Sequence, residues 1–113
     1  MNSPCNPVNK HDFSATKEEL KLENTLASIA KAIAHPARVR ILKILLTLDH
    51  NNGCLNSDLV SELGLAQSTV SEHLRILKTA ELITAEPIPP RMCYRINHDT
   101  LQQFNSAFNH IFA

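Results

Sequence analysis

The chain has 113 residues and no net charge at pH 7, and 43% of its residues are hydrophobic against 19% charged. This length fits one domain, and this balance favours a folded chain over a disordered one. Two isolated glycines exclude a glycine-rich phosphate loop, and the absence of a long apolar run excludes a membrane-spanning helix. The polar N-terminus lacks a signal peptide, so we expect a cytoplasmic protein with no membrane partner.

Helical patterns dominate the chain after a polar start. Residues 1–15 predict a flexible N-terminal arm, and residues 16–113 predict one domain. In chain order the expected elements are a helix at about 17–34, a helix at about 36–48, a strand stub at Cys54-Leu55, helices at about 57–63 and 67–79, strands at 82–86 and 92–96, and a helix at about 99–112. The expected fold is mainly α with a small β-hairpin wing, a winged helix-turn-helix in the order α-α-β-α-α-β-β-α.

Local signals fix several of these boundaries. Thr16 and Glu19 have the spacing of a capping box, and His35-Pro36 breaks the first helix from the second. Residues 87–90 hold three prolines and predict a loop at the hairpin tip. From the second helix we expect Val39, Leu42, Leu45 and Leu46 to face inward.

The two short helices joined at Gly64-Leu65 are typical of a helix-turn-helix. In the second of them Val70, Leu74 and Leu77 form an apolar stripe, and the opposite face is short and polar. Such a face can approach base edges in a major groove. The residues predicted to contact DNA from this helix are Gln67, Ser68, Thr69, Ser71, Glu72 and Arg75.

Cations elsewhere add to this prediction. Between residues 24 and 48 the only charges are Lys31, Arg38, Arg40 and Lys43, a run that could lie along phosphates. Arg91, expected at the base of the hairpin, and Arg95 suit a wing that contacts the DNA backbone or minor groove. We see no cluster of nucleophile, base and oxyanion donors, so we expect no enzyme.

Two segments carry a family resemblance. The stretch Ala32-Ile33-Ala34-His35-Pro36-Ala37-Arg38-Val39-Arg40-Ile41-Leu42 and the stretch Leu63-Gly64-Leu65-Ala66-Gln67-Ser68-Thr69-Val70-Ser71-Glu72-His73-Leu74 resemble the ArsR/SmtB family of bacterial metal-sensing repressors. The resemblance implies a winged-helix homodimer that binds a palindromic operator and releases it when an inducer binds. It also implies DNA contacts by Gln67, Ser68 and Ser71.

The last helix suggests how the dimer forms. A domain of this size cannot easily bury Phe104, Phe108, Ile111 and Phe112 alone. The helical spacing predicts that these side chains face inward. We expect a second copy of the chain to cover them by packing against the first and last helices. A helix that simply closes its own core remains the alternative.

Cysteines are the candidate sensing residues. The strand stub and the second wing strand are neighbours in a winged helix, so Cys54 and Cys93 could lie opposite each other. Two such thiols could bind a thiophilic metal or metalloid such as trivalent arsenic or antimony, with Cys5 as a third ligand, or respond to oxidants or sulfide. They could equally be small buried core residues.

Two function classes follow from these patterns. The first is a repressor that binds double-stranded operator DNA, and no cofactor beyond the thiol-bound ion is indicated. The second is a winged-helix protein-interaction module without DNA binding, which the neutral charge and the acidic Glu72 favour. The sequence identifies neither the operator nor the inducer.

Overall fold

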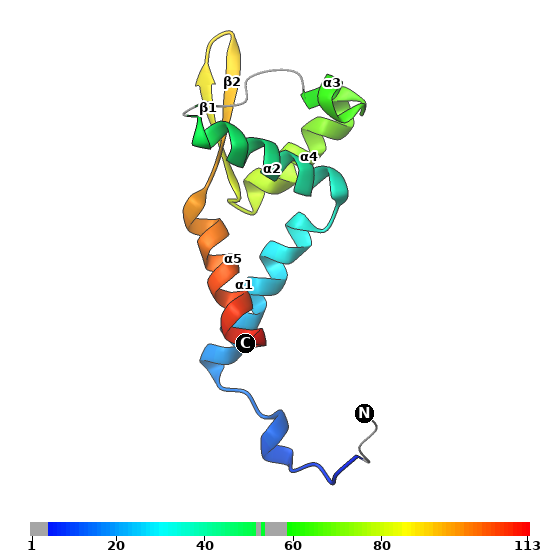
Figure 1. Ribbon diagram of the computed structural model, residues 1–113, viewed down its shortest axis with the longest axis vertical. Coiled ribbons are helices and arrows are strands. Elements are labelled where there is room, and N and C mark those ends of the chain that lie inside the picture. The colour runs from blue at the N-terminus through cyan, green and yellow to red at the C-terminus, as the bar shows by residue number, and fades with distance from the viewer. Residues whose placement is uncertain (1–4, 52, 54–58) are drawn as a thin grey trace.

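The computed structural model, which describes residues 5–51, 53 and 59–113, is a winged helix-turn-helix (Figure 1). Its elements are a 3₁₀ helix η1 at Lys10–Phe13, α1 at Lys17–Ile33, α2 at Pro36–His50, α3 at Leu59–Leu63, α4 at Gln67–Thr79, β1 at Ile83–Ile88, β2 at Arg91–Ile96 and α5 at His98–Phe112. Helices α3 and α4 form the helix-turn-helix, and β1 and β2 form the wing. The predicted strand stub at Cys54-Leu55 lies outside the described residues.

Helix α1 begins with the predicted capping box. The backbone N–H of Glu19 donates to Oγ1 of Thr16 at 3.1 Å, and the backbone N–H of Thr16 donates to Oε1 of Glu19 at 3.0 Å. These two hydrogen bonds lower the pKa of the Glu19 carboxyl. They satisfy N–H groups that the first turn of a helix leaves without partners, so the predicted start is confirmed.

The corner between α1 and α2 is closed by His35 and Pro36. Nδ1 of His35 accepts a hydrogen bond of 3.0 Å from the backbone N–H of Ala37. Pro36 occupies the first turn of α2, where its missing N–H removes no intrahelical hydrogen bond. The predicted helix break at His35-Pro36 is therefore confirmed.

One apolar core joins α2, α4 and the wing. Its most deeply buried side chains are those of Ile41, Leu45, Leu77, Leu82, Ile83 and Cys93. Val39, which we expected to face inward, is 51% exposed, so that prediction is wrong. Val39 lies two residues before Ile41, and about 100° of rotation per residue places it on the far side of α2.

The wing is a two-stranded antiparallel hairpin whose strands extend further than predicted. Pro87 pairs with Met92 and Ile88 pairs with Arg91, so the predicted loop over residues 87–90 shrinks to a turn at Pro89-Pro90. Among the described residues β1 pairs with β2 alone, so the other side of β1 is an edge. A proline whose nitrogen faces away from the partner strand therefore removes no hydrogen bond from the ladder.

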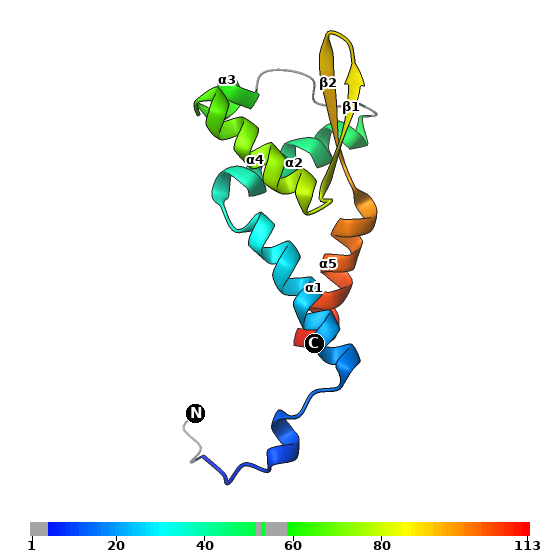
Figure 2. The ribbon, with the colours of Figure 1, turned by 180° about the vertical axis from the view of Figure 1, so that it is seen from behind.

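Helix α5 packs along α1 at the end of the domain away from the wing (Figure 2). Ala107 and Thr100 are the buried residues of α5. Phe108 and Phe112 are 48% and 65% exposed in the single chain, so the expectation that they face inward is wrong for one copy alone. Ala107 faces α1, and its neighbour Phe108 lies about a quarter of a turn away around the helix.

The described part of the N-terminal arm, residues 5–15, projects from α1 away from the domain and is exposed throughout (Figure 1). The side chain of Asn9 accepts a hydrogen bond from the backbone N–H of His11 and caps η1. Across the described ranges, no helix combines the length and the apolar character needed to cross a bilayer.

Candidate nucleic-acid interface

Helices α3 and α4 meet at a tight turn that contains Gly64. Its φ of +65° lies in the left-handed region, which glycine adopts at little energetic cost. Beyond the turn, Ala66 precedes α4 and gives its first turn no side-chain hydrogen bond. The first backbone N–H groups of α4 are therefore available to an acceptor outside the helix.

The solvent-facing surface of α4 holds every residue that we predicted to contact DNA from this helix. Val70, His73 and Leu77 are buried against the domain. The predicted residues are all exposed, namely Gln67, Ser68, Thr69, Ser71, Glu72 and Arg75. The fold thus gathers amide, hydroxyl, carboxylate and guanidinium groups on one accessible helix.

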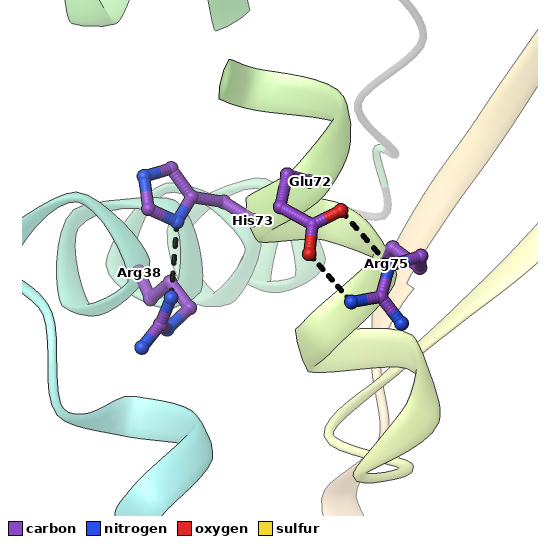
Figure 3. Close-up of polar contacts among 4 residues, drawn as sticks. All are labelled: Arg38, Glu72, His73 and Arg75. Carbon is purple, nitrogen blue, oxygen red and sulfur yellow. Dashed lines mark hydrogen bonds and ion pairs between the residues drawn. The ribbon is translucent and has the colours of Figure 1, made fainter. Parts of the chain in front are cut away.

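Glu72 and Arg75 form a two-point ion pair at the centre of this surface (Figure 3). Nε of Arg75 donates to Oε2 of Glu72 at 2.9 Å, and Nη2 of Arg75 donates to Oε1 at 2.5 Å. The hydrogen bonds lower the pKa of Glu72 and raise the pKa of Arg75, so both groups stay ionised. We did not predict this ion pair from the sequence, although the three-residue spacing of Glu72 and Arg75 along a helix indicates it.

A buried histidine anchors α4 to the corner between α1 and α2. Nη1 of Arg38 lies 3.2 Å from Nδ1 of His73 (Figure 3). The rings of His35 and His73 lie 4.4 Å apart between centroids. Nε of Arg38 also donates to the carbonyl oxygen of Ala32 at 2.6 Å. Three elements are therefore joined through one guanidinium group.

This arrangement keeps His73 neutral. Burial lowers the pKa of His73 below its usual value, and the nearby His35 and Arg38 lower it further. Because arginine can only donate, Nδ1 accepts and the ring proton resides on Nε2. Nε2 is buried and has no hydrogen-bond partner among the described atoms. The prediction that Arg38 could lie along phosphates did not include this contact, because Arg38 and His73 are 35 residues apart in the sequence.

The wing presents one exposed arginine near its tip. Arg91 begins β2 directly after the Pro89-Pro90 turn, so our placement of Arg91 at the base of the hairpin is wrong. The strands run through Pro87, which moves the turn toward Arg91. Arg95 is partly buried, and its Nη1 donates to the carbonyl oxygen of Gly53 at 3.5 Å.

The candidate sensing cysteines are described only in part. Cys93 is fully buried on β2, while Cys54 lies outside the described residues. Cys5 is exposed on the N-terminal arm, and this arm extends from the end of the molecule opposite the wing (Figure 2). Within residues 5–51, 53 and 59–113, no group of three His, Cys, Asp or Glu side chains gathers to hold a metal ion.

Known proteins resemble this chain most clearly over the helix-turn-helix. The family model for bacterial regulatory proteins of the arsR family matches residues 35–85. The uncharacterized HTH-type transcriptional regulator Rv0081 of Mycobacterium tuberculosis is 39% identical over 70 residues, which cover 62% of this chain. The chain spans only 59% of that relative's length. The arsenical resistance operon repressor of Staphylococcus xylosus is 31% identical over 80 residues, 71% of this chain and 73% of the repressor.

Solved structures share the fold. The crystal structure of Rv0081 is 29% identical and superposes with a TM-score of 0.57 over 87% of this chain and 91% of that one. Reduced HlyU from Vibrio cholerae is 24% identical and matches the fold with a TM-score of 0.66 over 87% of this chain and 100% of its own. By these matches the chain belongs to the ArsR family of bacterial regulatory proteins, a family of transcriptional regulators rather than enzymes, as the two sequence segments predicted.

Proposed function

We propose that the chain is a homodimeric, cytoplasmic repressor that binds double-stranded operator DNA and releases it when an inducer binds. The observation that carries the proposal is the exposed polar surface of α4, which has unsatisfied N–H groups at its N-terminus. Membership of a family of transcriptional regulators supports the same reading.

Helix α4 is the element that enters the major groove, which is about 12 Å wide and admits one helix. Gln67 and Ser68 lie in its first turn, where amide and hydroxyl groups reach base edges. The backbone N–H groups of the same turn donate to a phosphate. Arg91 at the tip of the wing contacts the backbone or the minor groove beside this site.

Dimerisation through α1 and α5 accounts for the exposed aromatic side chains. Ring centroids of Phe104 and Phe108 lie 6.3 Å apart, and those of Phe108 and Phe112 lie 5.0 Å apart, so the three rings form one strip along α5. On α1, the other helix of the proposed interface, Leu20 is 50% exposed. A twofold-related copy packed on this strip leaves both α4 helices accessible, so a palindromic operator with half-sites about 34 Å apart fits the dimer.

We infer that the inducer acts on the sulfur atoms of Cys54 and Cys93 in the reduced protein. We favour trivalent arsenic or antimony, since the chain is similar to an arsenical resistance operon repressor, with an oxidant or sulfide as the alternative. Cys93 is fully buried, so an inducer reaches it only when the residues packed around β2 move apart. Ligation lowers operator affinity if the inducer-bound protein prefers the weaker-binding conformation.

Fluorescence anisotropy with the duplex upstream of the chain's own gene tests DNA binding. The triple variant Gln67→Ala, Ser68→Ala, Arg75→Ala is expected to lose binding while it remains a dimer in sedimentation. A matched control removes an amide, a hydroxyl and a cation from the arm, as Asn9→Ala, Ser14→Ala and Lys10→Ala, and is expected to bind normally. Equal binding by the two triple variants refutes the assignment of α4. A wild-type dimer that binds no duplex points instead to the protein-interaction module.

The same assay with arsenite, diamide or persulfide tests the inducer. Cys54→Ser and Cys93→Ser are each expected to keep DNA binding and lose the response, and the reagent that acts on the wild type identifies the chemistry. Cys5→Ser shows whether the arm supplies a third sulfur. A response that survives both Cys54→Ser and Cys93→Ser contradicts the proposed site.

A further inference from the structure

A cavity of about 450 Å³ opens between α1, α2 and the C-terminal half of α4. Lys31 from α1, Arg38 from α2 and Arg75 from α4 line it together with the hydroxyl residues Ser28 and Thr79. No carboxylate is among its described lining residues. Three cations from three elements and two hydroxyl donors are groups that bind a phosphate.

We infer that this cavity is a phosphate-binding site that takes a backbone phosphate of the duplex held by α4. The inference rests on the proposed DNA binding and adds Lys31 and Arg38 to the residues that support it. Of the four cations in the run from Lys31 to Lys43, only these two line the cavity, while Arg40 and Lys43 do not.

Arg38 is held in position to act as a ligand. Its guanidinium has five N–H donors. One donates to the Ala32 carbonyl oxygen at 2.6 Å, and another is directed at Nδ1 of His73 at 3.2 Å. These two contacts fix the plane of the group and leave further N–H donors for a phosphate, so little conformational entropy is lost on binding.

Arg75 links the cavity to the surface that faces DNA. It lines the cavity and also pairs with Glu72 on the exposed surface of α4. Thr79 lies four residues beyond Arg75, on the same side of the helix. A helix seated in the major groove has phosphates along both of its flanks, so a cation site beside the DNA-facing surface suits a backbone phosphate of the same duplex.

Lys31 offers the cleanest test because it is exposed and forms no ion pair with a described residue. Each phosphate neutralised by a cation contributes about 0.9 to the slope of log K against log salt concentration. Lys31→Gln removes one cation from each protomer, so it is expected to reduce this slope by about 1.8 for a dimer bound to a 30-base-pair duplex of random sequence or to the duplex upstream of the gene. Lys10→Gln, which removes an exposed lysine on the N-terminal arm outside the cavity, is the control and is expected to keep the wild-type slope.

Titration of the free protein with inorganic phosphate distinguishes the sources of the phosphate. Millimolar or weaker binding that Lys31→Gln abolishes, together with the reduced slope, supports a backbone phosphate. Micromolar binding that competes with DNA assigns the site to a free phosphorylated molecule and overturns the backbone assignment. An unchanged slope in Lys31→Gln refutes the inference even though the wild type binds DNA. If the wild type binds no duplex, the proposed function fails. If the wild type then also binds no inorganic phosphate in the titration, the phosphate-binding site in the cavity is refuted as well.

Discussion

Replacing Arg38 with alanine tests the anchor that holds α4 on the α1–α2 corner. The change removes the hydrogen bond to the Ala32 carbonyl oxygen and the contact with Nδ1 of His73. It leaves the buried His73 ring with neither nitrogen paired, because Nε2 already lacks a partner among the described atoms. Buried polar atoms without partners destabilise a fold far more than exposed ones do.

The expected loss of stability follows from these two contacts. A hydrogen bond from a charged donor contributes about 1.5–3 kcal/mol, and an unpaired buried acceptor costs about 1–3 kcal/mol. Both figures describe the loss of the Arg38 contacts, one from the side of the donor and one from the side of the acceptor, so the two effects do not add in full. We expect Arg38→Ala to lower the free energy of unfolding by about 2–3 kcal/mol, which corresponds to about 6–15 °C in Tm for a domain of this size.

Urea denaturation followed by circular dichroism at one fixed protein concentration measures this loss, because the stability of a dimer depends on concentration. Arg40→Ala is the control, since Arg40 is an exposed cation on the same helix, and it is expected to change the free energy by less than about 0.5 kcal/mol. Arg38→Lys keeps the charge without the planar fork and is expected to fall between the two. Equal stability of Arg38→Ala and Arg40→Ala refutes the anchor.

Three further predictions concern other parts of the molecule. The depressed pKa of His73, caused by burial, His35 and Arg38, means that the unfolded chain takes up its proton at higher pH than the folded protein. Stability should therefore hold above about pH 6.5 and fall as the pH drops below it, and His73→Gln should reduce this fall in denaturant titrations. An unchanged pH profile contradicts the assignment. Phe108→Ser should weaken dimerisation about tenfold or more in sedimentation. Val39→Ser, which removes another exposed apolar residue, should leave dimerisation unchanged. Equal weakening of dimerisation by both variants excludes α5 as the interface. Gly64→Ala should lower the free energy of unfolding, measured in urea, by about 1 kcal/mol because the φ of Gly64 is +65°. An unchanged free energy of unfolding contradicts this reasoning and means that the turn relaxes to accept alanine.

Hydrophobic spacing and local capping were enough to predict most helices. The sequence predicts the second helix of the helix-turn-helix over about 67–79, and α4 is Gln67–Thr79 in the structure. Its boundaries depend on residues within one turn, because Gly64 stops the helix before it and the apolar stripe sets its length. Signals of this kind are local and do not require knowledge of the packing.

The anchor at His73 could not be predicted in this way. Arg38 and His73 are separated by 35 residues, and only the packing of α4 on α2 brings them together. A cation followed by apolar residues is equally typical of a phosphate contact and of a buried hydrogen bond. Pro87 shows the converse problem, since the local rule against proline in a strand does not apply when the proline lies on an edge strand.

The apolar residues that the sequence analysis expected to be buried and that are exposed are of two kinds, and the difference bears on the proposed dimer. Val39 is exposed on α2, where the buried residues Ile41, Leu42 and Leu45 already supply a complete inward face. Phe108 and Phe112 instead continue the strip that starts at the partly buried Phe104. The apolar face of α5 is therefore wider than the part of it that α1 covers. Helical periodicity reports burial in the assembled protein rather than in one chain. A periodic strip left half exposed therefore indicates a missing partner, whereas an isolated exposed valine does not.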